Sequence, residues 1–478
     1  MVSIRVAAPL ALLLLSSCVT GPDHTAPQTL LPEKFAEGGK KSNGEVAMAA
    51  WWTAFNDKRL NGLVDQGINQ NLDVLQALER ITAAEAGVVV AGAGGLPSLG
   101  VSAEESVSKS KGTGDYSART TDTTSTSSGG VSVSWLLDLF GQYRRAKESA
   151  SASLDAAYAS ADVAKLSFLS DLVTSYINAR YYQERIAIAR KNLASRRETL
   201  ELTKLQLEAG AASRLDVVQS EGLVNSTLAD LPGLETNFRR SAHHIATLLG
   251  LPASTLIADL QKGAPQPIAR RSINAGVPAD LIRNRPDIRK AERELASAVA
   301  EIGVAEAQLY PTITLGGSIS PSWISTKSLA GSLTSWSFGP SLTLPILDGG
   351  RLKANVDIAE SSARGAYLAW KASVLNAVEE VENALAAVNR DSQTVSALTA
   401  TVRSYEEALA LSTASYKDGA SSLLDVLDAQ RSVSTAQASL AQAVQQMAAD
   451  YVALNVAIGG GYAFDGKSAS GTKVAKNM

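Results

Sequence analysis

Cysteine is nearly absent from this 478-residue chain, and the single one, Cys18, lies close to the N-terminus. One cysteine excludes an intrachain disulfide and a zinc site built from thiolates. Histidine is almost as scarce, with only His24, His243 and His244. Adjacent helical residues point about 100° apart, so His243 and His244 do not form the i,i+4 pair that binds a metal. We therefore expect no metal site.

The signs of several other function classes are also missing. The net charge of −3 and the pI near 5.8 do not indicate nucleic-acid binding. The glycines of 92–95 lack the dinucleotide-binding spacing, because Pro97 stands where the last glycine of that motif belongs. No activated nucleophile with a neighbouring base is recognisable. The sequence thus predicts no enzyme and no cofactor, and a hydrolase finds no support.

Long apolar runs are absent too. The longest candidate, Val6 to Leu15, is interrupted by Pro9 and is too short to span a bilayer. Because Arg5 precedes it, residues 1–17 are typical of an export signal. Leu15-Ser16-Ser17-Cys18 resembles a bacterial lipobox, in which Cys18 is acylated and becomes the first mature residue. The alternative is an ordinary secretory signal with a chance cysteine.

The residue after Cys18 is Val19 and not Asp, which by the sorting rule for such lipoproteins favours the outer membrane. Several acyl chains would anchor the N-terminus stably. The following residues, 19–50, are rich in proline, glycine and small polar residues and are typical of an extended tether. The aromatic patch Trp51-Trp52-Thr53-Ala54-Phe55 is interpreted as local packing at the start of a folded unit.

Most of the remaining chain has helical periodicity. Only 5% of residues are aromatic and 45% are hydrophobic, a mixture that suits long, closely packed helices. Apolar residues recur every seven positions in the second half of the chain, which predicts a coiled-coil seam. The positions are Tyr367, Val374, Val381, Val388, Val395, Val402, Leu409 and Tyr416. A weaker copy runs from Tyr158 to Leu207, and a kink or break is expected at Pro232-Gly233.

Two of these helices end in turns of similar sequence. Gly210 and Gly419 each interrupt a helical pattern, and a new helix follows within a few residues. Asp216 and Asp425 occupy equivalent places after them. Two helical hairpins with matching tips indicate a duplicated chain.

Four segments change to a period of two and predict strands. Val131, Val133 and Trp135 alternate with serines, and the same holds around Leu99, Ile313 and Trp336. We expect two hairpins, 97–138 and 311–347, with polar loops at 106–130 and 320–334. Each strand of about ten residues with one apolar face fits a tilted membrane strand. The alternative is a small soluble sheet packed on helices.

Four strands cannot close a barrel, and lipid does not tolerate open sheet edges. Several copies must therefore pool their strands: two give eight, and three give twelve with room for a lumen. The polar alternate residues would line that lumen: Ser132, Ser134, Thr312, Thr314, Ser337, Ser341 and Thr343.

The sequence thus divides into six parts. A signal peptide (1–17) precedes a lipidated tether (18–56). The first repeat (57–250) holds a helix, a β-hairpin and a helical hairpin with its tip at 210. A connector (251–277) leads to the second repeat (278–458), with its tip at 419, and a C-terminal tail (459–478) follows.

Several motifs, in order, resemble the TolC-like outer-membrane factors of bacterial multidrug efflux systems, of the lipoprotein NodT type. Asn71-Leu72-Asp73 and Asn284-Arg285-Pro286-Asp287 resemble the paired helix starts of that family. Tyr310-Pro311 resembles its helix-to-strand junction. Asp138-Leu139-Phe140-Gly141 and Asp348-Gly349-Gly350-Arg351 resemble its strand-to-helix junctions.

The resemblance implies a mainly α fold with membrane β-structure. Long coiled-coil helices form an α-barrel, and four strands per chain join a 12-stranded trimeric β-barrel. It implies a homotrimeric passive duct for drugs or other small molecules, supplied by a periplasmic adaptor and an inner-membrane transporter of the resistance-nodulation-division type. The alternatives are a type I protein secretion duct and a periplasmic coiled-coil scaffold outside any membrane.

The resemblance also assigns roles at the tips. Gly210, Ser213, Asp216, Gly419 and Ser422 would dock the adaptor. Asp425 and Asp428 match a carboxylate pair that some relatives direct into the periplasmic aperture, where a low effective dielectric strengthens their field. For Asp425 the alternative is a residue of the helix N-terminal turn, stabilised by the helix dipole. Some relatives carry arginine where this chain has Ser421, so a resting lock that needs that arginine is not expected.

Overall fold

The computed structural model describes residues 19–28, 30–38, 50–111, 121–269, 276–327 and 329–462. The signal peptide and Cys18 lie outside this set. Two compact units, each assembled from distant stretches of sequence, make up the fold. The sheet unit comprises Met1–Gln28, Arg80–Ala157 and Lys290–Trp370, and the hairpin unit comprises Thr29–Glu79, Tyr158–Arg289 and Lys371–Met478.

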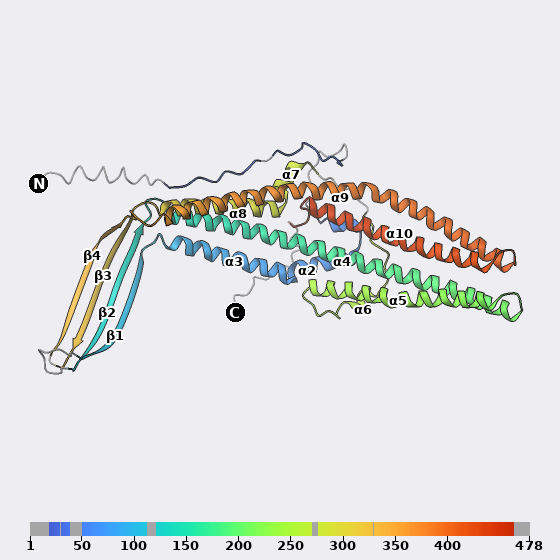
Figure 1. The fold of residues 1–478 in the computed structure, drawn as a ribbon, viewed down its shortest axis with the longest axis horizontal. Coiled ribbons are helices and arrows are strands. Elements are labelled where there is room, and N and C mark those ends of the chain that lie inside the picture. Colours follow the sequence, from blue (N-terminus) through green and yellow to red (C-terminus); the bar gives the residue numbers. More distant parts are fainter. Residues whose placement is uncertain are drawn as a thin grey trace. The chain divides into compact units, whose positions relative to one another are not determined.

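The two halves of the chain build the same elements in the same order (Figure 1). Helices α4 (Gln142–Glu208) and α9 (Arg351–Lys417) have 67 residues each, and α5 (Arg214–Leu248) and α10 (Leu423–Ala457) have 35 each. Helices α3 (Leu72–Ala93) and α8 (Pro286–Ala307) have 22 each. Equal lengths are what a duplicated chain predicts. No helix in the described part of the chain carries an apolar stretch of the length that a bilayer requires.

The strands form one antiparallel sheet in the order β1-β2-β3-β4. They are longer than the expected ten residues: β1 (Ser98–Lys111), β3 (Thr312–Ser325) and β4 (Ala330–Thr343) have 14, and β2 (Thr121–Leu137) has 17. The predicted polar loops at 106–130 and 320–334 were therefore wrong over much of their length. Ser106 pairs with Thr126 and Ser322 with Leu333, because hydroxyl residues sustain a backbone ladder as well as apolar ones do.

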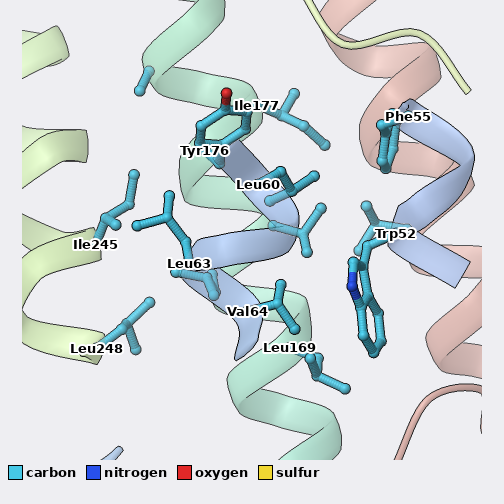
Figure 2. Close-up of a cluster of buried hydrophobic side chains, with 14 of the residues drawn as sticks. Trp52, Phe55, Leu60, Leu63, Val64, Leu169, Tyr176, Ile177, Ile245 and Leu248 are labelled. Atoms are coloured by element: carbon cyan, nitrogen blue, oxygen red, sulfur yellow. The ribbon is translucent and has the colours of Figure 1, made fainter. Parts of the chain in front are cut away.

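The core of the hairpin unit forms around the aromatic patch, as predicted. The short 3₁₀ helix η1 (Trp51–Phe55) and helix α2 (Lys58–Gln70) pack on α4, with Trp52, Leu60 and Tyr176 fully buried (Figure 2). The Tyr176 hydroxyl donates a hydrogen bond of 2.6 Å to Asp57, and burial raises its pKa to about 12. The break predicted near Asn69–Asn71 is confirmed, since Asn71 Oδ1 accepts from the Val74 amide (3.0 Å) at the start of α3.

The end of α10 explains two motifs at once. Gly461 has φ +103°, and a Cβ there would meet Trp51 Nε1 at 2.7 Å, while that indole nitrogen donates to the Gly460 carbonyl (3.0 Å). The buried Arg285 follows the short helix α7 (Pro278–Asn284) and donates to the last carbonyl of α10, that of Ala457 (3.0 Å). Arg285 also pairs with Asp287 and Glu380. The Asn-Arg-Pro-Asp motif and the triple glycine therefore close the end of one helix.

A kink or a break was expected at Pro232-Gly233, and the break does not occur, because helix α5 continues through Pro232. Proline removes one backbone donor, but Leu228, whose carbonyl loses its partner, lies on an exposed side of α5. Water can satisfy that carbonyl, so the helix continues. The connector 251–277 contains one short helix, α6 (Ile257–Leu260), among its described residues.

Candidate functional site

The sheet has two faces of opposite character. Its register places Leu99 beside Val133, Val133 beside Gly317, and Gly317 beside Phe338 on one side. That side is apolar and uncovered within the sheet unit: Trp336 is 78% exposed and Phe338 76%. The other side carries mainly hydroxyls and glycines, and the Ser318 and Ser337 hydroxyls lie 3.0 Å apart on it. The predicted lumen residues, from Ser132 to Thr343, all belong to this polar face.

Tryptophans lie near both borders of the apolar face and in its middle row, where Trp336 pairs with Ile319. Trp135 pairs with Leu315 near the helical end of the sheet, and its indole donates to the Gly95 carbonyl (3.0 Å). Trp323 lies further along the same face of β3. From Leu315 to Trp323, β3 rises about 26 Å at roughly 3.3 Å per residue, which a tilt reduces to about 20 Å. The apolar band thus has nearly the height of a bilayer core with aromatic residues at both borders.

A clasp holds the N-terminal segment at the junction between sheet and helices. We use the name for Thr20, Gly21, Phe140, Arg145 and Gly303. The Thr20 amide and hydroxyl both donate to the Phe140 carbonyl (3.1 and 3.0 Å). The buried Arg145 donates to the carbonyls of Thr20 and Gly21, each at 3.0 Å. Phe140 follows β2 and stacks on Tyr310, which precedes β3. Val19, the neighbour of the predicted lipid-bearing Cys18, is therefore held at the end of the sheet where β2 ends and β3 begins.

Two backbone segments cross in the clasp, at Gly21 and Gly303, where a side chain would not fit. Gly21 has φ +85°, and a Cβ there would lie 2.4 Å from Gly303 Cα. Gly21→Ala is expected to release the segment around Thr20, because neither backbone can move aside cheaply. Hydrogen exchange of residues 19–24 in the purified protein measures this, with at least a tenfold faster exchange expected, about 1.4 kcal/mol in opening free energy.

Gly222→Ala is the matched control, since nothing lies within 4 Å of its Cβ position. Equal protection of residues 19–24 in the Gly21→Ala protein and its control would contradict the assignment of the clasp.

The two hairpin tips have the same geometry. Gly210 and Gly419 have φ +76° and +72°, which favours glycine. The Ala211 amide donates to the Gln206 carbonyl (2.7 Å) and the Ala420 amide to that of Ser415 (2.8 Å), as in a Schellman end. Each following helix begins with a serine–aspartate pair, described next. Cβ atoms at both glycines would meet open space, so the tips are exposed.

The aspartates of the first helical turn cap their own helices. The Asp216 carboxylate accepts from the Ser213 amide (2.8 Å) and hydroxyl (2.7 Å). The Asp425 carboxylate does the same with Ser422, at 3.0 and 2.9 Å. The alternative considered for Asp425, a residue of the N-terminal turn, is thus present in the structure. Its exposed carboxylate remains open to solvent as well.

Asp428 has a partner that the sequence reasoning missed. The Asp428 carboxylate accepts a hydrogen bond of 2.8 Å from Arg431, one helical turn further on α10, and both side chains are more than half exposed. The positive charge of Arg431 weakens the negative field expected from Asp428. The i,i+3 spacing of this pair was visible in the sequence. Arg431 also lines a cleft of about 310 Å³ between α5 and α10, with Gly222, Leu223 and Leu427. The Ser421 hydroxyl donates a hydrogen bond to the Ser412 carbonyl of its own hairpin (3.4 Å).

A pair of carboxyl groups joins α9 to α10. Burial raises the pKa of Asp391 to about 6, and repulsion by Asp450 adds to the shift. The Asp450 carboxylate in turn accepts from Gln446 (3.0 Å). A raised folded pKa means that this group stabilises the fold fully below about pH 4 and that the contribution is lost as the pH rises through 6.

Asp391→Asn is therefore expected to leave thermal stability unchanged at pH 4 and to raise it at pH 8. We expect about 1 kcal/mol at pH 8 after allowing for solvent screening, because the group is only partly buried. Melting curves at the two pH values measure this, with the exposed Glu407→Gln on the same helix as control. A stabilisation of equal size at both pH values would contradict the shift.

Comparison with known proteins identifies the family. The family model described as "Outer membrane efflux protein" matches residues 63–251 and 277–460. The chain belongs to this outer membrane efflux protein family. It is 60% identical over 461 residues to "Nodulation protein T" of Rhizobium leguminosarum bv. viciae, covering 96% of this chain and 94% of that protein.

Two further comparisons agree with the family. "Outer membrane protein OprJ" of Pseudomonas aeruginosa is 32% identical, with 96% of each chain covered. The solved outer-membrane channel OprN superposes with a TM-score of 0.82 at 31% identity, over 93% of this chain and 100% of that one. The predicted family and the predicted fold class, long helices with four barrel strands per chain, are confirmed.

The family explains the arrangement of the surfaces described above. This outer membrane efflux protein carries its apolar belt on one face of the sheet and a hydroxyl-lined surface on the other. No group of three or more metal-binding side chains occurs in the described residues. His243 and His244 lie on α5, where one is half-buried and the other exposed.

Proposed function

We propose that three copies of this outer membrane efflux protein form a passive exit duct across the outer membrane. The observation that carries the proposal is the four-stranded sheet with one apolar face, one hydroxyl face and two edge strands, β1 and β4. Edges are unfavourable in lipid, so β4 of one copy would pair with β1 of the next. Three copies give twelve strands, enough to leave a polar lumen.

The duct has no catalytic step in this proposal and holds no cofactor. Its substrates are drugs or other small molecules that an inner-membrane pump delivers through a periplasmic adaptor. The exposed tips, with Gly210, Ser213, Asp216, Gly419 and Ser422, dock the adaptor. The cleft between α5 and α10 supports this role, because Leu223, the exposed Leu424 and Arg431 offer an approaching helix both apolar and charged contacts. The pump is of the resistance-nodulation-division type.

Acylation of Cys18 anchors the duct in the outer membrane. The clasp supports this proposal, since it holds Val19 at the end of the strands, where acyl chains attached to the preceding residue reach the bilayer. Residues 1–17 act as the signal peptide that is removed. The proposed division into two repeats, 57–250 and 278–458, is consistent with the equal lengths of their helices.

Membrane fractionation combined with gel migration tests the proposed assembly. The full-length protein is expected in the outer-membrane fraction and to migrate as a trimer unless the sample is boiled. Intact-mass analysis of the mature chain is expected to show acylation at Cys18, absent in Cys18→Ala. A soluble monomer or dimer would instead support the periplasmic scaffold and overturn the duct.

A further inference from the structure

The polar face of the sheet carries one charge among the side chains that the structure describes. Strand pairing places Glu104 beside Ser128, Ser128 beside Ser322, and Ser322 beside Leu333. Because side chains alternate, these four residues share the face of Ser132 and Ser318. Among the side chains that the structure describes on this face of the four strands, Glu104 is the one that carries a charge. Its neighbours are hydroxyls, glycines and a few aliphatic groups.

The carboxylate of Glu104 is solvated and not neutralised within the described part of the chain. The residue is exposed, and no described lysine or arginine forms an ion pair with it. The lysines of β1, Lys109 and Lys111, have odd numbers like Leu99 and therefore belong to the apolar side of the sheet. Their charges point away from the surface that Glu104 shares.

The level of Glu104 in the sheet is also defined. Glu105, the next residue, lies on the opposite face in the row of Ser127 and Trp323, at the outer border of the apolar band. Glu104 therefore lies roughly 20 Å along β1 from Ser98, at about 3.3 Å per residue. A solute that moves along the polar face from the Ser98 end therefore reaches Glu104 after it has passed most of the apolar band.

We propose that Glu104 determines charge preference in the strand section of the duct, favouring cationic solutes and hydrated cations over anions. The inference rests on the proposed trimer, in which three copies of the carboxylate surround one lumen. Their fields overlap when the Debye length, about 30 Å at 0.01 M salt and about 10 Å at 0.1 M, is comparable to the lumen width. The preference is thus expected to be strong at low salt and to weaken as salt rises.

The chain offers a matched control, because Glu104 and Glu105 are adjacent, chemically identical and on opposite faces. Purified trimers are placed in planar bilayers, and the reversal potential in a KCl gradient gives the ratio of cation to anion permeability. Glu104→Gln is expected to lower that ratio by about threefold at 0.01 M salt, and Glu104→Lys to reverse the preference. Glu105→Gln is expected to leave it unchanged.

The outcomes separate the inference from the proposed function. Conducting Glu104→Gln trimers with the wild-type reversal potential would overturn the role of Glu104 while leaving the duct intact. An equal change in Glu105→Gln would overturn it too, since the effect would then not follow the lumen face. Wild-type protein that forms no channel would overturn the duct itself.

Discussion

Val131→Lys is expected to prevent the protein from assembling in the outer membrane. Val131 lies in the middle row of the apolar face, beside Val101 and Ile319. A lysine on the lipid face of a membrane barrel costs about 2–4 kcal/mol near the midplane, and a trimer carries the substitution three times. The sum is comparable to the whole stability of many folded domains. The measurement is the amount of unboiled trimer in outer-membrane fractions.

Ser132→Lys, one residue later, is the control for this prediction. Ser132 belongs to the polar face, beside Gly100 and Ser318, so its lysine would reach water in the lumen. Trimer yield is expected to stay near the wild-type level. Equal losses in the two variants would show that the two faces do not separate lipid from lumen.

Asp428→Ala is expected to weaken block of the duct by multivalent cations about tenfold when they are added from the side of the hairpin tips. Removing the carboxylate leaves Arg431 without its 2.8 Å partner, so each chain gains one unit of positive charge at this level. Three copies then repel cations at the aperture. A tenfold change in affinity corresponds to about 1.4 kcal/mol. Single-channel current with a trivalent cation measures it.

Three further variants separate charge from fold at the tips. Asp428→Ala with Arg431→Ala restores neutrality and is expected to recover part of the block. Asp216 caps the other hairpin's helix as Asp425 caps α10. Asp216→Ala therefore costs about 1 kcal/mol of local stability without acting at the aperture. Unchanged block in Asp425→Ala with Asp428→Ala would remove both residues from the aperture.

Much of the fold followed from periodicity. The seven-residue repeat through Val374 and Val381 located α9, and both residues are buried. Gly210 and Gly419 marked the tips correctly because a left-handed helix end favours glycine. The ends of the strands were missed. The outer halves of β1 and β2 carry few apolar side chains, so their hydropathy does not indicate strands, although their backbones remain paired.

The sites were harder to predict, because they depend on contacts between distant residues. The clasp joins Thr20 to Phe140 and Gly303, and no local pattern indicates such a crossing. The Asp428–Arg431 pair was not predicted, because an i,i+3 spacing permits an ion pair without requiring one. Glu104 was placed among the polar alternate residues of the first strand, but no role was assigned to it. The register then showed which residues of the neighbouring strands share its face.

Electrical recording from the purified full-length protein in a planar bilayer tests the central claim most directly. A passive trimeric duct predicts stepwise, ohmic conductance increments that require no nucleotide or proton gradient and that disappear when the trimer is boiled apart before addition. Protein that remains trimeric and inserts into the bilayer yet conducts no ions, under conditions that open the aperture, would contradict the account.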